Sequence, residues 1–175
     1  WTAPLGRIPA AFLDVAHKNG VAVSGVAGVP YGGLSSAYKA MMAGLYNVGA
    51  KKASQFFNYY GIDGMGYNSE FSDYSGTVDD LRDFHADLMK QMKAKNPIFM
   101  NFWYDGTNDN GSITFDQGLG SHNQETFGDS ENPRTSLFFN YNWNKEWLLS
   151  GSVTKAESMK RDPLDLYAGI NMQGG

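Results

Sequence analysis

The sequence predicts an α/β fold that forms part of a (β/α)8 TIM barrel, and two observations support this prediction. Short apolar runs with strand character alternate with helical patterns, which is typical of parallel βαβ units. Five such runs end in polar or aromatic residues, as barrel strands do where they form an active site. A complete barrel typically needs about 250 residues. The 175 residues of this chain are therefore interpreted as an incomplete barrel of about five βα units. They are expected to form one domain over 1–175.

The first half of the chain is expected to supply two strands and the helices around them. The first strand-like run, over 21–29, is rich in β-branched residues and apolar at both odd and even positions, as in a strand that is buried on both faces. The helix before it stops at Asn19-Gly20, a usual C-terminal signal. The expected elements are a helix over 10–18, a strand over 21–29, a helix over 35–60 broken near Asn47 to Gly49, and a strand over 62–70.

The second half begins with a helix whose apolar residues recur at steps of three and four, and ends with three strands. Thr77 is expected to cap that helix, because Asp79 and Asp80 follow in the first turn. His85 lies beside the apolar stripe and is interpreted as a packed or half-exposed helix residue. The remaining expectations are the stripe Leu81, Phe84, Leu88 and Met92, strands over 97–105, 135–143 and 165–173, a long loop over 106–134, and a broken, partly helical segment over 145–159.

Composition excludes several classes of function. The net charge of -4, without any run of Lys and Arg, argues against a nucleic-acid partner. No apolar stretch approaches 18 residues, so we expect no membrane insertion. The three histidines are far apart and Cys is absent, so neither a metal site nor a cofactor is expected. The chain starts at Trp1 without a signal-like segment, which suggests a trimmed N-terminus. A secreted or cell-surface protein of bacterial origin is expected, with a cytoplasmic one as the alternative.

The second strand carries the residues with the clearest chemical potential. Gly64, Gly66, Asn68 and Glu70 share one face because side chains alternate along a strand. Asn68 and Glu70 would lie roughly 7 Å apart, close enough to act on one sugar ring. Ordinary retaining glycosidases use two carboxylates, whereas here the partner of Glu70 is an amide. Such a pair suits a substrate whose own 2-acetamido oxygen is the nucleophile.

Four motifs, DGMGYNSE, FWYDG, FFNYNW and YAGINMQGG, resemble in order and spacing those of family 85 glycoside hydrolases, the endo-β-N-acetylglucosaminidases. The segment FLDVAHKNGVAVSGVAGVP is similar to a helix-to-strand region of that family. The resemblance implies a glycoside hydrolase catalytic barrel, present in part over 1–175. It also implies hydrolysis of the GlcNAc-β1,4-GlcNAc core of N-linked glycans by a substrate-assisted (oxazolinium) retaining mechanism, without a metal.

The resemblance also implies roles for individual residues. Asn68 matches the residue that orients the acetamido group, and Glu70 matches the general acid/base. Tyr104 corresponds to a tyrosine near the oxazoline, Trp143 to an aromatic wall, and Asp105 completes the WYD motif. The candidate substrate-binding residues are Tyr104, Trp143, Phe115, Tyr31, Asn142, Asp105 and Asn171.

Some positions depart from the family pattern and keep alternatives open. Phe115-Asp116-Gln117 stands where the family has WQN, and Asn171 stands where it has Asp. A family 18-like chitinase or hexosaminidase is one alternative. Of its DxxDxDxE motif the chain keeps Asp63 and Glu70, but it has Gly and Asn at the two inner acids. The other alternative is a non-catalytic glycan-binding barrel.

Overall fold

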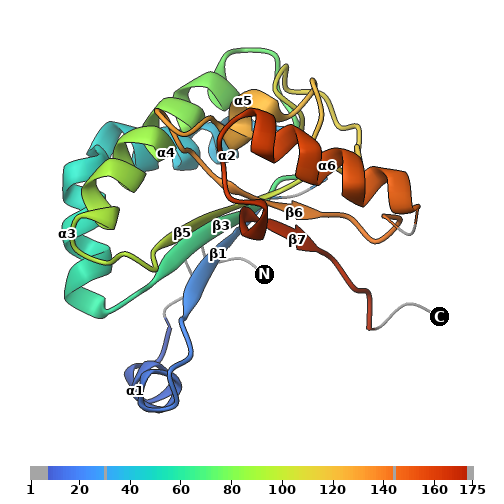
Figure 1. Ribbon diagram of the computed structural model, residues 1–175. Helices are drawn as coiled ribbons and strands as arrows, with labels where there is room; N and C mark the ends of the chain where they lie inside the picture. Colours follow the sequence, from blue (N-terminus) through green and yellow to red (C-terminus); the bar gives the residue numbers. More distant parts are fainter. Residues whose placement is uncertain (1–7, 30, 144, 173–175) are drawn as a thin grey trace.

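The computed structural model describes residues 8–29, 31–143 and 145–172. A five-stranded sheet with the order β1-β3-β5-β6-β7 lies under a layer of helices (Figure 1). Every neighbouring pair of strands in this sheet is parallel. The structure therefore confirms the predicted α/β class and the predicted parallel order of five strands.

The strands of the main sheet are shorter than the apolar runs that predict them, because each run includes residues of the adjoining loops. Their bounds are β1 Ser24–Gly28, β3 Gly64–Asn68, β5 Met100–Tyr104, β6 Ser136–Phe139 and β7 Leu166–Ala168. The expected end of the last strand at Gln173 lies outside the described residues. A second, unpredicted sheet pairs β2 (Gly32–Gly33) with β4 (Phe71–Ser72), also in parallel.

Two expectations about helices were wrong. Thr77 is the first residue of its helix, and the capping position belongs to Gly76, whose φ of 90° suits glycine. The segment expected to be broken is one helix, in which Ser150 and Thr154 donate hydrogen bonds to carbonyls four residues before them. The helices are α1 Ala10–Lys18, α2 Ser36–Val48, α3 Ala50–Tyr60, α4 Thr77–Lys93, α5 Gln124–Phe127, α6 Glu146–Ser158 and the 3-10 helix η1 Pro163–Asp165.

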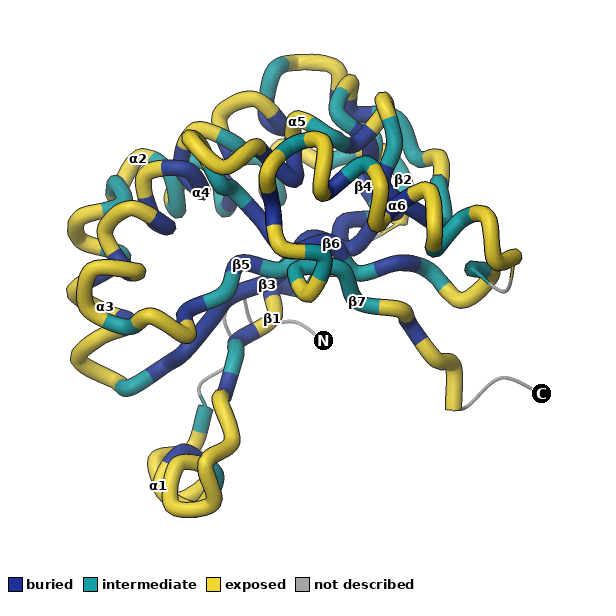
Figure 2. Tube along the Cα trace, in the orientation of Figure 1, coloured by how far each residue is buried: buried dark blue, intermediate teal, exposed yellow. Residues whose placement is uncertain are grey.

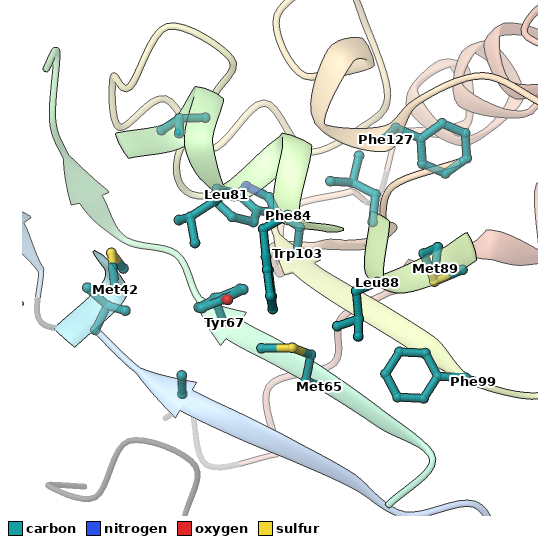
Figure 3. Packing of buried hydrophobic residues seen from close by; sticks show 14 of the residues in the cluster. Met42, Met65, Tyr67, Leu81, Phe84, Leu88, Met89, Phe99, Trp103 and Phe127 are labelled. Atoms are coloured by element: carbon teal, nitrogen blue, oxygen red, sulfur yellow. The ribbon is translucent and has the colours of Figure 1, made fainter. Parts of the chain in front are cut away.

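The core lies between the sheet and its helices. Met65, Tyr67 and Trp103 point from the sheet toward α4, where Leu81 and Leu88 meet them (Figure 3). The whole apolar stripe predicted for α4 is buried, and so is His85, at 1% exposure. Burial lowers the pKa of His85 to about 3, so its ring is neutral. Among the described residues, no helix combines the length and apolar character needed to cross a membrane.

The opposite face of the sheet is more open (Figure 2). Val26, Gly66 and Phe102 stand side by side in the register of β1, β3 and β5, with Val26 53% exposed and Phe102 half-buried. One row further on, Tyr104 and Phe138 are paired in register on β5 and β6. This row marks the carboxyl ends of the strands, where the predicted site should lie.

The segment between β5 and β6 is more ordered than the long loop predicted there. Thr107 and Ile113 form an antiparallel bridge near its start. The carboxylate of Asp109 accepts hydrogen bonds from the backbone N–H groups of Glu125 and Thr126 at 2.9 and 2.8 Å, and so holds the first turn of α5. Both ends of the segment are thus attached to the body of the domain.

Candidate functional site

Asn68 and Glu70 lie together at the carboxyl end of β3. The side-chain Nδ2 of Asn68 donates a hydrogen bond of 3.1 Å to Oε2 of Glu70. This bond turns the amide N–H toward the carboxylate and leaves the amide carbonyl to accept from another group. Asn68 is exposed and Glu70 is half-buried, so a ligand can reach both side chains.

Close packing from the next strand fixes the backbone around this pair. Ser69 faces the interior and donates a 2.5 Å hydrogen bond to the carbonyl of Tyr104. The hydroxyl of Thr107 lies 2.8 Å from the Ser69 carbonyl and accepts from the N–H of Phe71 at 3.0 Å. A Cβ at Gly106 would lie 2.4 Å from the Ser69 carbonyl and 3.3 Å from Cγ of Glu70. Only glycine lets the chain just after β5 approach the Ser69 carbonyl and the Glu70 side chain so closely.

Two cavities adjoin at the pair, both within the size range of ligand pockets. The first, of about 310 Å³, lies over the open sheet face and is lined by Phe102, Tyr104 and Tyr141 among others. The second, of about 530 Å³, is lined by Glu70, Tyr31 and Tyr38. Val26 and Asn68 line both, so the amide of Asn68 stands where the two spaces meet.

Cavity size alone does not identify this place. A hollow of about 610 Å³ lies elsewhere, beside Trp147 and His122. The two cavities beside Asn68 differ from it in chemistry: only there, among the cavities described, does a carboxylate accept a hydrogen bond from a side-chain amide.

Tyr104 is the centre of an aromatic cluster at this edge of the sheet. Its hydroxyl donates a 2.7 Å hydrogen bond to Oδ1 of Asn140. Its ring centroid lies 6.0 Å from that of Phe115 and 6.4 Å from that of Tyr141. Burial, followed by the proximity of Tyr141 and the charges of Glu70 and Asp105, raises the pKa of Tyr104 well above its usual range. The phenol therefore stays neutral and acts as a hydrogen-bonding group.

Asp105 follows Tyr104 but points into the protein. It is 2% exposed, and its pKa is raised to about 7, chiefly by burial. Phe115 reaches the site from the following loop, where its φ of 49° is unusual for a residue other than glycine. The structure thus brings Tyr31, Tyr104, Asp105 and Phe115 to the same edge of the sheet as Asn68 and Glu70.

The structure places the other three candidates further from the pair. The indole N–H of Trp143 donates a 2.5 Å hydrogen bond to the carbonyl of Gly169, and its ring packs against the core. Asn142 lies in a turn, where its backbone N–H donates to Oε1 of Gln117 at 3.0 Å. Asn171 is exposed beyond β7. None of the three lines the two cavities described here, and their roles in binding stay predictions.

Several residues that line the cavities were missed, among them Tyr38, Phe138 and Tyr141. Tyr141 was missed because β6 ends at Phe139 and the chain turns there, so strand alternation does not apply beyond that residue. The two asparagines that flank Tyr141 were the available turn signal. Tyr38 belongs to α2, which the sequence does not show to lie near β3. Among the described residues, no group of three or more His, Asp or Glu side chains is placed to hold a metal ion.

Comparisons with known proteins identify the family of this chain. A family model described as glycosyl hydrolase family 85 matches residues 7–175. The cytosolic endo-beta-N-acetylglucosaminidase of Homo sapiens is 26% identical over 172 residues, which are 95% of this chain and 23% of that protein. The enzyme of the same name from Gallus gallus is 26% identical over 167 residues, 94% of this chain and 22% of that protein. The chain therefore spans less than a quarter of the length of these relatives.

A solved structure shows the same fold. The glycoside hydrolase domain of Spr0440, Endo-D, from Streptococcus pneumoniae R6 superposes with a TM-score of 0.80 at 24% sequence identity. The match covers 97% of this chain and 28% of that chain. The five parallel strands and their helices therefore form an arrangement that recurs within a larger glycoside hydrolase domain.

Proposed function

Because the chain belongs to glycosyl hydrolase family 85, we propose that it carries the catalytic pair of an endo-β-N-acetylglucosaminidase. The substrate is an N-linked glycan, and the bond hydrolysed is GlcNAc-β1,4-GlcNAc in its core. The observation that carries the proposal is the 3.1 Å hydrogen bond from the Asn68 amide to Glu70, beside two cavities at the carboxyl ends of the strands. The names of the human and chicken relatives support the reaction class.

Glu70 is the general acid and then the general base. It protonates the oxygen that leaves the cleaved bond, and later removes a proton from the incoming water. A two-carboxylate retaining mechanism needs a second carboxylate about 5 to 5.5 Å away as nucleophile. Here the neighbour of Glu70 is an amide, and the next carboxyl group along the site, Asp105, is buried. The acetamido oxygen of the substrate therefore serves as the nucleophile, and an oxazolinium forms.

Asn68 orients that acetamido group. Its N–H is bonded to Glu70, so its carbonyl oxygen is the group left to accept a hydrogen bond from the substrate N–H. This bond strengthens as positive charge develops on the oxazolinium, which is how such a group stabilises a transition state more than a ground state. Tyr104 and Phe115 supply aromatic surface beside the pair, and Tyr31 borders the cavity of Glu70.

The structure also bears on the alternatives. In a family 18-like enzyme Asp63 would open the acidic motif of the site. Asp63 instead lies just before β3, at the opposite end of the strand from Glu70, and accepts hydrogen bonds from His17, Val23 and Asn96. Those bonds give it a structural role. Membership of a glycosyl hydrolase family favours the enzyme over a non-catalytic glycan-binding barrel.

The names of the relatives bear on the expected location. The curated relatives are named as cytosolic proteins, so they do not support the secreted or cell-surface expectation. The cytoplasmic alternative is the one that agrees with them.

The decisive experiment is Asn68→Ala in the complete natural protein, assayed with two donors. A natural N-glycan requires the step that Asn68 assists, and we expect its hydrolysis to fall by about 10²–10³-fold. A preformed sugar oxazoline has already passed that step and needs only Glu70, so its use should persist. Equal loss of both activities with an intact fold, or loss of neither, would refute substrate assistance through Asn68.

A further inference from the structure

Asn140 holds two parts of the cleft with a single oxygen atom. It is the half-buried residue that directly follows β6, where the chain turns away from the sheet. Its side-chain Oδ1 accepts a 2.7 Å hydrogen bond from the hydroxyl of Tyr104 and a 2.8 Å hydrogen bond from the backbone N–H of Tyr141. An amide oxygen has two lone pairs, so both of its acceptor positions are occupied.

The bond from Tyr141 determines the direction of the bond from Tyr104. A backbone N–H can only donate, so the amide atom that faces it must be the oxygen and not the nitrogen. The Tyr104 hydroxyl lies against the same oxygen and must therefore donate its one proton to it. A ligand group that reaches this hydroxyl then meets lone pairs, for which a sugar O–H is a suitable donor.

The two residues that Asn140 holds border the same cavity. Tyr104 and Tyr141 both line the cavity of about 310 Å³ beside Asn68. Their ring centroids lie 6.4 Å apart, with an angle of 38° between the ring planes. Tyr104 ends β5 and is 7% exposed, whereas Tyr141 lies in the turn after β6 and is 49% exposed. Oδ1 of Asn140 thus joins the ends of two neighbouring strands at the place where their rings border the cleft.

Other contacts hold the strands and the turn independently of Asn140. Strand β6 pairs with β5 and β7 through residues that precede Asn140. The turn is also held by Gln117, whose Oε1 accepts a 3.0 Å hydrogen bond from the N–H of Asn142. Loss of the Asn140 oxygen should therefore leave the sheet in place and release the Tyr104 phenol and the Tyr141 backbone. This is the behaviour of a residue that positions a site.

We propose that Asn140 is a positioning residue of the cleft, which fixes the Tyr104 hydroxyl and the Tyr141 backbone through one oxygen and so sets the spacing of the two rings that border the cavity beside Asn68. Asn140 acts through these two tyrosines, and it lines neither of the two cavities described around Asn68. The identity of the ligand, an N-glycan, rests on the proposed function. The placement of the rings does not, because it follows from the two hydrogen bonds.

The first test is kcat/KM for an N-glycan in the complete natural protein. Asn140→Leu keeps the branched shape but removes the acceptor, so kcat/KM should fall about tenfold, as expected for the loss of one hydrogen bond. Asn140→Asp restores an oxygen at the same place and should recover most of that loss at its own pH optimum. Asn58→Leu makes the same exchange on the exposed surface of α3 and should follow the wild type. Wild-type kcat/KM in Asn140→Leu would overturn the proposal.

A double-mutant cycle distinguishes positioning from a general structural role. Tyr104→Phe removes the hydroxyl that Asn140 holds, so Asn140→Leu should lower kcat/KM by about threefold at most in that background. This remaining effect is the one that acts through Tyr141. Two independent effects would instead multiply, to a loss of about a hundredfold in the double variant. A multiplicative loss would overturn the proposal that Asn140 acts through Tyr104.

Crystal structures of the complete protein test the positions without reference to activity. In Asn140→Leu, and in the smaller Asn140→Ala, the rings of Tyr104 and Tyr141 should lose their fixed separation of 6.4 Å, whereas Asn58→Leu should keep it. Unchanged rings in both Asn140 variants would overturn the proposal. A wild-type protein that cleaves no N-glycan, while the rings shift in the Asn140 variants, would contradict the proposed function and support the positioning of the two rings by Asn140.

Discussion

The two faces of the sheet differ in what their side chains do, and the contrast is clearest at two adjacent residues of β5. Trp103 points to the helices, is 0% exposed, and donates a 2.9 Å hydrogen bond to the carbonyl of Thr107. Phe102 points to the open face, is half-buried and lines the cavity beside Asn68. Because side chains alternate along a strand, one short segment can serve the core and the site separately. Substitutions on the two faces should therefore have separable effects.

The largest expected effect belongs to the open face. Glu70→Gln keeps the size of the side chain but cannot transfer a proton, so hydrolysis of N-glycans should fall by about 10²–10⁴-fold. The melting temperature should not change, because Glu70 is only half-buried and Gln can still accept from Asn68. Turnover of N-glycans by the complete protein and thermal unfolding provide the two measurements. Wild-type turnover in this variant would show that Glu70 is not the acid.

A substitution on the helix-covered face should lower the stability of the protein and leave its activity nearly unchanged. Trp103→Ala removes the largest buried side chain of the core and one buried hydrogen bond, so it should lower the free energy of unfolding by about 3–5 kcal/mol. Denaturant titration of the complete protein measures this change. Glycan hydrolysis by the fraction that stays folded should remain close to the wild-type rate. A loss below about 1 kcal/mol would mean that this face is not the core of the domain.

Phe102→Ala is the matched control for Trp103→Ala and should destabilise the protein less. The ring is half-buried and contacts Tyr167 at 5.3 Å between centroids, so about 1–2 kcal/mol should be lost. Because Phe102 lines the cavity, KM for the glycan should rise more than it does in Trp103→Ala. If Phe102→Ala destabilised the protein as much as Trp103→Ala, the contrast between the two faces would fail.

Local signals predicted most of the fold correctly. Gly49, with a φ of 83°, breaks the long helical pattern as expected, and the apolar stripe of α4 is buried throughout. The failures occurred where distant residues decide the structure. Helix α5 depends on Asp109, which is 16 and 17 residues before the two N–H groups that it caps. Thr77 carries the residue type of a cap, yet the backbone conformation places Gly76 at that position.

Local sequence signals predicted the candidate site only in part, as they did the fold. Asn68 and Glu70 could be chosen from sequence because an amide and a carboxyl group two residues apart follow a strand-like run, although β3 ends at Asn68 and Glu70 lies just beyond it. Tyr38 and Tyr141 could not, because their positions depend on how α2 and the turn after β6 pack against β3 and β5. The burial of Asp105 was equally hidden, since the motif that contains it gives no sign of which way the carboxyl group points.

The anchoring of the segment between β5 and β6 has an evolutionary consequence. Thr107 fixes its start to Ser69, between Asn68 and Glu70, and Asp109 fixes the start of α5. Insertions or deletions between Ile113 and Gln124 can therefore change the rim of the cleft while Asn68 and Glu70 keep their separation. Such changes can alter the shape of the cleft without moving these two residues. Homologues should accordingly vary in length within this interval and hardly at all between Gly64 and Thr107.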